Sequence, residues 1–428
     1  MPPAPEDSSA GAGPAAPGPP PRSKRALAWT ASSYFGEGLP WTFLHQMGTE
    51  FLTAIGASTT QIGSTSLLHL AVTFKFAWSP LVDLFGQRRT WVIVLQFLLG
   101  LGMLGVAAIS ASRNLTVFWS LLGLLAIVHA THDIACDGFY LQALGKTDQA
   151  LYSGVRIAAF RGAMIVGSSA LVYLAAHTSW TVGFGAAGVL MGLMALLNAF
   201  LMPRLPETRA STGPRTHAAG AFWAASFRSF LAQPQAGLVL SFMFLYKLGD
   251  IMMFAMSKPL LRDIGIDTSH RSILNGLGTA ATILGSVSGG ALIARLGISR
   301  CLAPMTFFQN LAIPLYIVMA LSKPKFGWVI PIVMFEQFAA GVGAAAHVVY
   351  LMQRCRAAFS ASHYAFATAI VSLGSTLSGY ASGPLNQALG HPWFFTLAFA
   401  ASLPSLILVL IVPTTSFDLA EPVPMTGR

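Results

Sequence analysis

Residues 90–111 read TWVIVLQFLLGLGMLGVAAISA and contain no charged side chain. At the helical rise of about 1.5 Å per residue this run is about 33 Å long, which matches the hydrocarbon core of a bilayer. Similar runs recur along the chain, because 54% of its 428 residues are hydrophobic and only 9% are charged. A soluble domain carries about 25% charged residues. The composition therefore excludes a soluble enzyme, a disordered protein and a disulfide-stapled secreted domain.

Twelve apolar segments follow a proline-rich start, and each is long enough to cross a bilayer as a helix. Barrel strands are not expected, because they would show shorter segments of alternating polarity. We therefore expect an all-α membrane protein with twelve transmembrane helices. The expected spans are residues 27–53, 60–83, 90–111, 115–143, 151–176, 180–202, 235–261, 270–295, 300–321, 327–353, 360–387 and 391–413.

A longer polar connection after the sixth segment divides the chain into two six-helix halves. The first 25 residues contain eight prolines and cannot bury a core, so we expect a disordered tail there. The expected parts are a Pro/Ala-rich tail (1–25), a first half (26–202), a cytoplasmic linker (203–222), a second half (223–414) and a cytoplasmic tail (415–428).

The loop charges predict the orientation in the membrane. If the N-terminus is cytoplasmic, sixteen Lys and Arg residues lie on the inner side, whereas the outer side holds Arg113, Arg262, Arg271, Lys323 and Lys325. We therefore expect a multi-pass protein of the cell (inner) membrane with both termini in the cytoplasm. The net charge of +10 lies mostly in these loops, so the expected partner is the lipid bilayer and not nucleic acid.

A weak internal repeat links the two halves. Residues 79–89 read SPLVDLFGQRR, and residues 290–300 read GALIARLGISR at an offset of 211, with the second glycine and the last arginine in register. Paired halves of this kind are typical of secondary transporters, whose solute site lies near the membrane midplane between them.

The first copy of this repeat resembles the signature loop of the major facilitator superfamily through Asp83, Gly86, Arg88 and Arg89. Gly86 permits a tight turn. Asp83 can cap a neighbouring helix and pair with an arginine, so the loop is expected to act as a gate that forms or breaks with conformation. The alternative is a charged loop that is fixed only by the inner-side excess of positive charge.

Charged side chains inside the apolar spans are costly, so each is expected to face a cavity or a partner. Counted at the helical rise, Glu37, Asp133, Arg161 and Lys247 lie about 16–18 Å from the inner ends of their helices. They therefore share one level near the bilayer centre. The charged set is Glu37, Lys75, Asp133, Asp137, Arg161, Lys247, Asp250 and Glu336.

These charges have two interpretations. They can neutralise one another as structural pairs, or they can form a transport site. In the second case Arg161, Lys75 and Lys247 attract an anionic solute, and Glu37, Asp250 and Glu336 orient these cations or gate the path. Asp133 or Asp137 then carries the coupling proton, and the i,i+4 spacing of these two residues does not choose between them. Pro40 is expected to break the first helix near mid-membrane.

Motifs in both halves resemble the AmpG-type muropeptide permeases, from about residue 30 to residue 413. The matching segments are 38–40, 74–83, 133–138, 160–164, 246–250, 335–336, 341–345 and 359–361. Gly138 after Asp137 is more similar to the siderophore-importing and acetyl-CoA-transporting branches of this wider group. The resemblance implies the major facilitator fold and proton-driven import of bulky, usually anionic metabolites.

We therefore expect a proton-coupled transporter that imports a muropeptide-like, siderophore or acyl-CoA-type solute by alternating access, and we expect it to be a monomer. A membrane-embedded enzyme acting on a lipid or glycan is the alternative, but the sequence shows no convincing nucleophile–base pair. Cys136, Cys301 and Cys355 are too few and scattered for a zinc site or a disulfide framework. No cofactor or metal is expected.

Overall fold

A computed structural model describes residues 24–78, 82, 86–112, 114–144, 146–205, 224–356 and 360–415. Every regular element in these ranges is a helix, which confirms the expected all-α class. Nine of the described helices are long and apolar enough to cross a membrane by length and composition. The first two expected crossings, over residues 24–54 and 59–77, are also helical, although the second is divided into short pieces.

The first half follows the expected spans to within a few residues, apart from the second and the fifth. In the described residues the second span is helical to Ala77, and the helix of the fifth begins at Lys146. The elements of this half are α1 (Lys24–Thr42), η1 (Phe43–Met47), α2 (Gly48–Ala54), α3 (Thr59–Gly63), η2 (Ser64–Leu68), α4 (His69–Phe74), η3 (Lys75–Ala77), α6 (Arg88–Ser110), α7 (Leu115–Ala143), α8 (Lys146–Ile165), η4 (Val166–Leu171), α9 (Val172–His177) and α10 (Trp180–Leu201).

The second half contains the remaining crossings. Its elements are α12 (Ala236–Leu245), α13 (Leu248–Asp263), α14 (Thr268–Leu296), α15 (Ile298–Asn310), α16 (Ala312–Ser322), α17 (Phe326–Gln353) and α18 (Ser360–Leu408). The long α18 holds two of the expected crossings, because Gly390 adopts φ 73° and ψ 162° and divides it. Only glycine enters this left-handed region without strain, so the chain reverses there.

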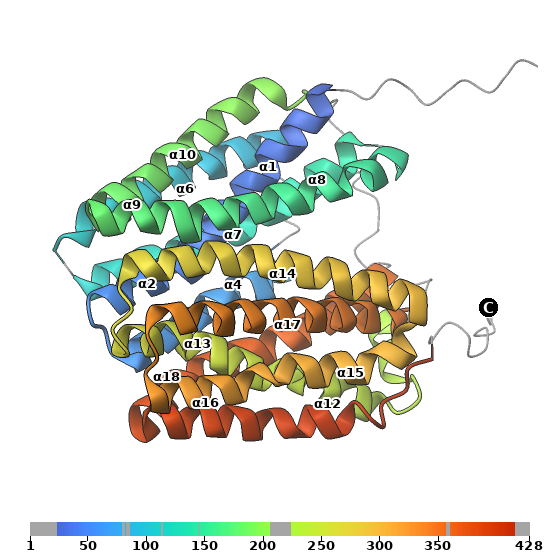
Figure 1. Ribbon diagram of the computed structural model, residues 1–428. Helices are drawn as coiled ribbons and strands as arrows, with labels where there is room; N and C mark the ends of the chain where they lie inside the picture. The colour runs from blue at the N-terminus through green and yellow to red at the C-terminus, as the bar shows by residue number, and fades with distance from the viewer. Residues whose placement is uncertain are drawn as a thin grey trace, which may run out of the picture.

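The two halves lie side by side as separate helical bundles (Figure 1). Two helices of the second half make most of the contact between them: α14 runs along η4 and α9, and α18 runs along α3, η2 and α4. The described chain begins and ends at the same end of the molecule, and α2 lies toward the opposite end (Figure 1). The contacts between the two halves can therefore differ in composition between the two ends of the bundle.

Short polar side chains begin several of these helices. Asn114 accepts a hydrogen bond from the backbone N–H of Val117 at 3.2 Å at the start of α7. Asp267 accepts one from His270 at 2.8 Å at the start of α14. Such caps satisfy N–H groups that have no partner within the helix, so the starts of long helices are fixed locally by sequence.

Glycines set the closest helix contact of the second half, between α14 and α17. A Cβ atom added at Gly285 would overlap the carbonyl oxygen of Phe338, and one added at Gly341 would overlap the carbonyl oxygen of Thr282. Small residues of this kind let helix backbones approach in a membrane, where apolar burial gives little driving force. The outer surface is rich in exposed leucine, valine and aromatic side chains, as lipid contact requires.

The structure differs from the expectation for Pro40, and the predicted tails and linker lie mostly outside its described residues. The first helix does not break at Pro40, since α1 continues to Thr42 and then widens into the π-helix η1. Most of the predicted tails and of the linker (residues 1–23, 206–223 and 416–428) lies outside the described residues.

The glycine contact predicts a local stability difference. Gly285→Ala is expected to lower the free energy of unfolding by about 1–3 kcal/mol, because the added methyl group meets backbone that cannot move freely. Thermal unfolding of the purified chain in lipid or detergent measures this effect. Gly290→Ala is the matched control on the same helix, since nothing lies within 4 Å of its added Cβ. Equal effects of the two substitutions would contradict the proposed close contact.

Candidate functional site

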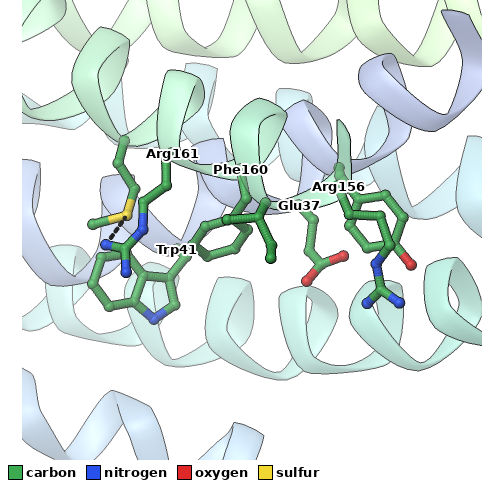
Figure 2. A pocket seen from close by; sticks show the side chains of 8 residues that line it. Glu37, Trp41, Arg156, Phe160 and Arg161 are labelled. Atoms are coloured by element: carbon green, nitrogen blue, oxygen red, sulfur yellow. Dashed lines mark hydrogen bonds between the residues drawn. The ribbon is translucent and has the colours of Figure 1, made fainter. Parts of the chain in front are cut away.

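A partly open cavity of about 410 Å³ lies between α1 and α8 in the first half. Its walls combine charged and aromatic side chains, which is unusual for the interior of a membrane protein. Figure 2 shows Arg161 and Trp41 at one end of the cavity, Phe160 in the middle, and Glu37 and Arg156 at the other end. The lining residues are Tyr34, Glu37, Trp41, Arg156, Ile157, Phe160, Arg161 and Met164.

Arg161 is a cation without a carboxylate partner among the described residues. Its Nη1 atom donates a weak hydrogen bond to the sulfur of Met164 at 3.5 Å. The rings of Trp41 and Phe160 lie beside it with centroids 6.2 Å apart. A guanidinium in such a cavity is free to bind an anion bidentately, and the rings offer an apolar surface next to it.

At the other end, Arg156 is held by three groups. Its Nη2 atom donates to Oδ1 of Asp137 at 2.7 Å, and the Tyr34 hydroxyl donates to the same oxygen at 2.7 Å. The guanidinium lies over the rings of Tyr34 and Tyr140, with 4.2 and 4.7 Å to their centroids. The Asp137 side chain is 42% exposed, so solvent reaches this end of the cavity.

Each half contains one lysine–aspartate pair at an interrupted helix. Lys75 begins the short helix η3 and pairs with Asp133 of α7. Lys247 lies in the turn between α12 and α13 and pairs with Asp250 at 3.1 Å. The two lysines that the sequence assigned to solute binding are therefore paired with carboxylates, and an anion would have to compete for them.

The remaining predicted acids, Glu37 and Glu336, differ in their surroundings. Glu336 is buried and accepts hydrogen bonds on both oxygens from Nε2 of Gln337, at 3.0 and 2.8 Å. Glu37 is 9% exposed, and its Oε2 atom has no hydrogen-bond partner. Burial without a partner is costly for a charged group.

A second polar cluster joins the two halves and consists of Glu50, Arg271, Lys258 and Asn275. Arg271 Nε lies 2.9 Å from Oε2 of Glu50, and Lys258 Nζ lies 3.8 Å from Oε1. Asn275 Nδ2 donates to Oε1 at 3.1 Å and to the Ser168 carbonyl at 3.2 Å. Glu50 is wholly buried, so we call this cluster the outer seal, with α2 on one side and α13 and α14 on the other.

Backbone contacts extend the outer seal toward the end of the molecule that lies far from the described termini (Figure 1). Lys258 donates to the Gln46 carbonyl at 3.2 Å, and Arg262 donates to the carbonyls of Thr53 and Ala57, both at 3.4 Å. Sequence reasoning missed this site. Glu50 lies inside the first expected span, so the rule that singled out Glu37 would also have found it.

The predicted gating loop is described in part. Gly86 has φ 73°, which explains the need for glycine. Arg88 donates from Nη1 to the Gly138 carbonyl at 3.1 Å, and Arg89 donates to the carbonyls of Met202 and Ala199 at the end of α10. Arg88 therefore joins α6 to α7, and Arg89 joins α6 to the C-terminal end of α10, where a cation is favoured. Asp83 lies outside the described residues.

Among the described residues, no group of three His, Cys, Asp or Glu side chains is arranged to hold a metal ion. The arrangement can do three things through its own side chains: bind an anion at Arg161, exchange ion-pair partners at the lysines and Arg156, and hold a proton on a carboxylate. Sequence reasoning did not select the other six lining residues, which are Tyr34, Trp41, Arg156, Ile157, Phe160 and Met164.

Comparison with known proteins identifies relatives of this chain. Residues 27–358 match the sequence model of the Major Facilitator Superfamily. The Anhydromuropeptide permease of Escherichia coli (strain K12) is 30% identical over 393 residues, covering 89% of this chain and 78% of that protein.

Solved structures show the same fold. The nucleoside transporter NupG superposes with a TM-score of 0.67 at 15% identity, covering 90% of this chain and 98% of that one. The POT family transporter PepTSo superposes with a TM-score of 0.66 at 11% identity, covering 91% and 97%. At these identities the likeness concerns the fold alone.

The charges of the outer seal are predicted to control how often the two halves separate at this end of the molecule. Glu50→Gln leaves Arg271 and Lys258 buried without an anion, which costs about 3–5 kcal/mol in the closed arrangement. The halves should therefore separate more often at this end. Maleimide labelling of a cysteine in place of the buried Ser168, followed by mass spectrometry, is expected to accelerate by at least about tenfold.

Thr60→Ala is the matched control for this labelling experiment. It removes an exposed hydrogen bond to Gln387 across the same interface, 2.6 Å long, without stranding a charge. Its labelling rate is expected to stay close to that of the parent. If Glu50→Gln is labelled as slowly as Thr60→Ala, the ion cluster does not hold the two halves together.

Proposed function

The chain belongs to the major facilitator superfamily, and from this premise we propose that it is a proton-coupled symporter that imports a bulky anionic organic solute across the inner membrane by alternating access. The observation that carries the proposal is Arg161, a cation with no carboxylate partner in the described ranges, in a cavity with aromatic walls. A membrane protein keeps such a charge only where a partner or solute compensates it.

The cavity chemistry suits a solute that has an acid group and an apolar face. Arg161 would bind the acid group, and Trp41 and Phe160 would contact a sugar or ring next to it. The E. coli relative is named for anhydromuropeptides, which join sugar to peptide and carry carboxylates. We propose a solute of this kind, with siderophores and acyl-CoA compounds as the other classes to screen.

Ion-pair exchange would connect solute binding to proton binding. Asp133 is held by Lys75, and Asp137 is held by Arg156. When a solute anion takes one of these cations, the aspartate loses its counter-charge in a low-dielectric site and gains affinity for a proton. Asp133 and Asp137 are therefore proposed as proton acceptors in the loaded state. Lys247 with Asp250 and Glu336 would offer the corresponding contacts from the second half.

The orientation of the chain in the membrane determines on which side the outer seal lies during the transport cycle. We propose that both termini lie in the cytoplasm, as the loop charges predict, so that Glu50 and its partners lie on the opposite side. The cavity is then in contact with the cytoplasm while the seal is closed. Import requires the seal to open and the inner ends to approach, with Arg88 and Arg89 holding the helices of the first half as one body.

The solute-binding role of Arg161 predicts a change in KM. In proteoliposomes with an inward proton gradient, radiolabelled anhydromuropeptide is expected to accumulate with the wild-type chain. Loss of a desolvated charge contact costs about 2–5 kcal/mol, so Arg161→Ala should raise KM by at least about tenfold. Arg161→Lys should recover part of this loss, since it keeps the charge without the bidentate geometry.

Arg295→Ala is the control for charge removal, because this exposed arginine lies at the end of α14, far along the chain from the cavity. Its KM should equal that of the wild type. Unchanged KM in Arg161→Ala, with wild-type transport confirmed, would remove the anchor role. If no solute class accumulates with the wild-type chain, the transport proposal itself fails.

Asp133→Asn tests the coupling role in the same assay. The substitution frees Lys75 for the solute but leaves no carboxylate to accept the proton. Solute binding should therefore persist, while uptake no longer rises with the proton gradient. An Asp133→Asn chain that is well expressed and as dependent on the gradient as the wild type would exclude this residue from coupling.

A further inference from the structure

Three carboxylates surround the cavity of the first half, and two of them are engaged by cations. Asp133 pairs with Lys75, and Asp137 accepts from both Arg156 and Tyr34. The third, Glu37, lines the cavity and has no salt bridge to a cation in the described part of the chain. One of the three carboxylates beside this cavity therefore has no cation partner among the described residues.

Glu37 cannot relieve this imbalance by moving into solvent. It is 9% exposed and lies between Gly36 and Gly38 in α1. A Cβ atom at Gly38 would come within 2.6 Å of the Phe160 carbonyl, and one at Gly36 within 2.6 Å of Nε2 of Gln96. Helix α1 is thus packed directly against α6 and α8, which fixes the Glu37 backbone beside the cavity.

One buried oxygen of Glu37 has no donor, and the neighbouring Asp133 carboxylate can share a hydrogen bond with Glu37 only if one of the two acids is protonated. The Oε2 atom is buried and has no hydrogen-bond partner. A charged carboxylate in this position would have an oxygen with neither a donor nor a counter-ion, whereas a protonated acid has only a neutral group to bury. Glu336, the buried acid of the second half, lacks this feature because Gln337 donates to both of its oxygens.

The charges that act on Glu37 come from three neighbouring elements as well as from its own helix. Asp133 and Asp137 of α7 carry the same charge as an ionised Glu37, whereas Arg156 of α8 carries the opposite charge. The titratable and charged groups near it are Tyr34 on α1, Asp133, Cys136 and Asp137 on α7, Arg156 and Arg161 on α8, and Lys75 on η3.

We infer that Glu37 binds the coupling proton in the empty carrier and passes it on when the solute arrives, which rests on the proton symport proposed above. The proton adds to a Glu37 carboxylate oxygen from water in the cavity. When the solute anion takes Lys75, the freed Asp133 accepts the proton that leaves Glu37, and Glu37 becomes a charged carboxylate near Arg156. Figure 2 shows Glu37 and Arg156 side by side at the same end of the cavity.

Infrared spectroscopy of the full chain in lipid nanodiscs, without any solute, tests the resting state directly. At neutral pH the wild-type spectrum is expected to contain the carbonyl stretch of a protonated carboxylic acid, and Glu37→Gln should remove it. Glu336→Gln is the matched control on the other buried glutamate and should keep the Glu37 contribution. A band that is lost in Glu336→Gln and kept in Glu37→Gln would overturn the inference.

Transport in proteoliposomes separates this inference from the function on which it rests. With one coupled proton, a gradient of about one pH unit drives about tenfold accumulation. Glu37→Gln is expected to lose this accumulation of radiolabelled anhydromuropeptide and to keep solute exchange at equal pH. Gradient-driven accumulation that matches the wild type would refute the role of Glu37. A Glu37 acid band in a chain that exchanges no solute would refute the transport proposal and leave the protonation of Glu37 standing.

Discussion

A charged side chain inside a membrane needs a counter-charge, and this constraint organises the whole polar interior of the protein. Removing an ion from water is costly, and only a close partner compensates the cost. Lys75 with Asp133, Lys247 with Asp250, and Arg156 with Asp137 follow this rule. Arg161, Glu37 and Glu336 have no such partner in the described ranges. The first two line the same cavity, whereas Glu336 accepts from Gln337. Two of the departures from the rule thus lie at the cavity where we propose that a solute and a proton bind.

The same constraint explains why the contact between the halves is polar at one end. Glu50 in the first half faces two cations of the second half, so separating the halves there exposes three ions together. The glycine contacts within a half have the opposite character, because they join backbones through small residues without any charge. The halves, however, meet both at this ion cluster and at close glycine contacts, because a Cβ atom added at Gly383 of α18 would overlap the Thr59 carbonyl oxygen of α3.

Sequence reasoning predicted the helices well because length and apolarity alone decide whether a segment crosses a bilayer. It also found most of the charged residues in the spans, since each is conspicuous among apolar neighbours. Pairing was beyond its reach: Lys75 and Asp133 are separated by 58 residues, and only the fold shows that they meet. Arg156 was counted as a loop charge, and the aromatic walls were not selected, because Trp41 and Phe160 look like ordinary core residues in a sequence.

The complete burial of Glu50 has a consequence for the salt around the protein. While the seal is closed, dissolved salt cannot approach the cluster and leaves its ion pairs unscreened. Once the halves part, mobile ions surround Glu50, Arg271 and Lys258 and stabilise them individually. Ionic strength on that side of the membrane therefore acts on only one of the two arrangements, and more salt favours the one in which the halves have parted.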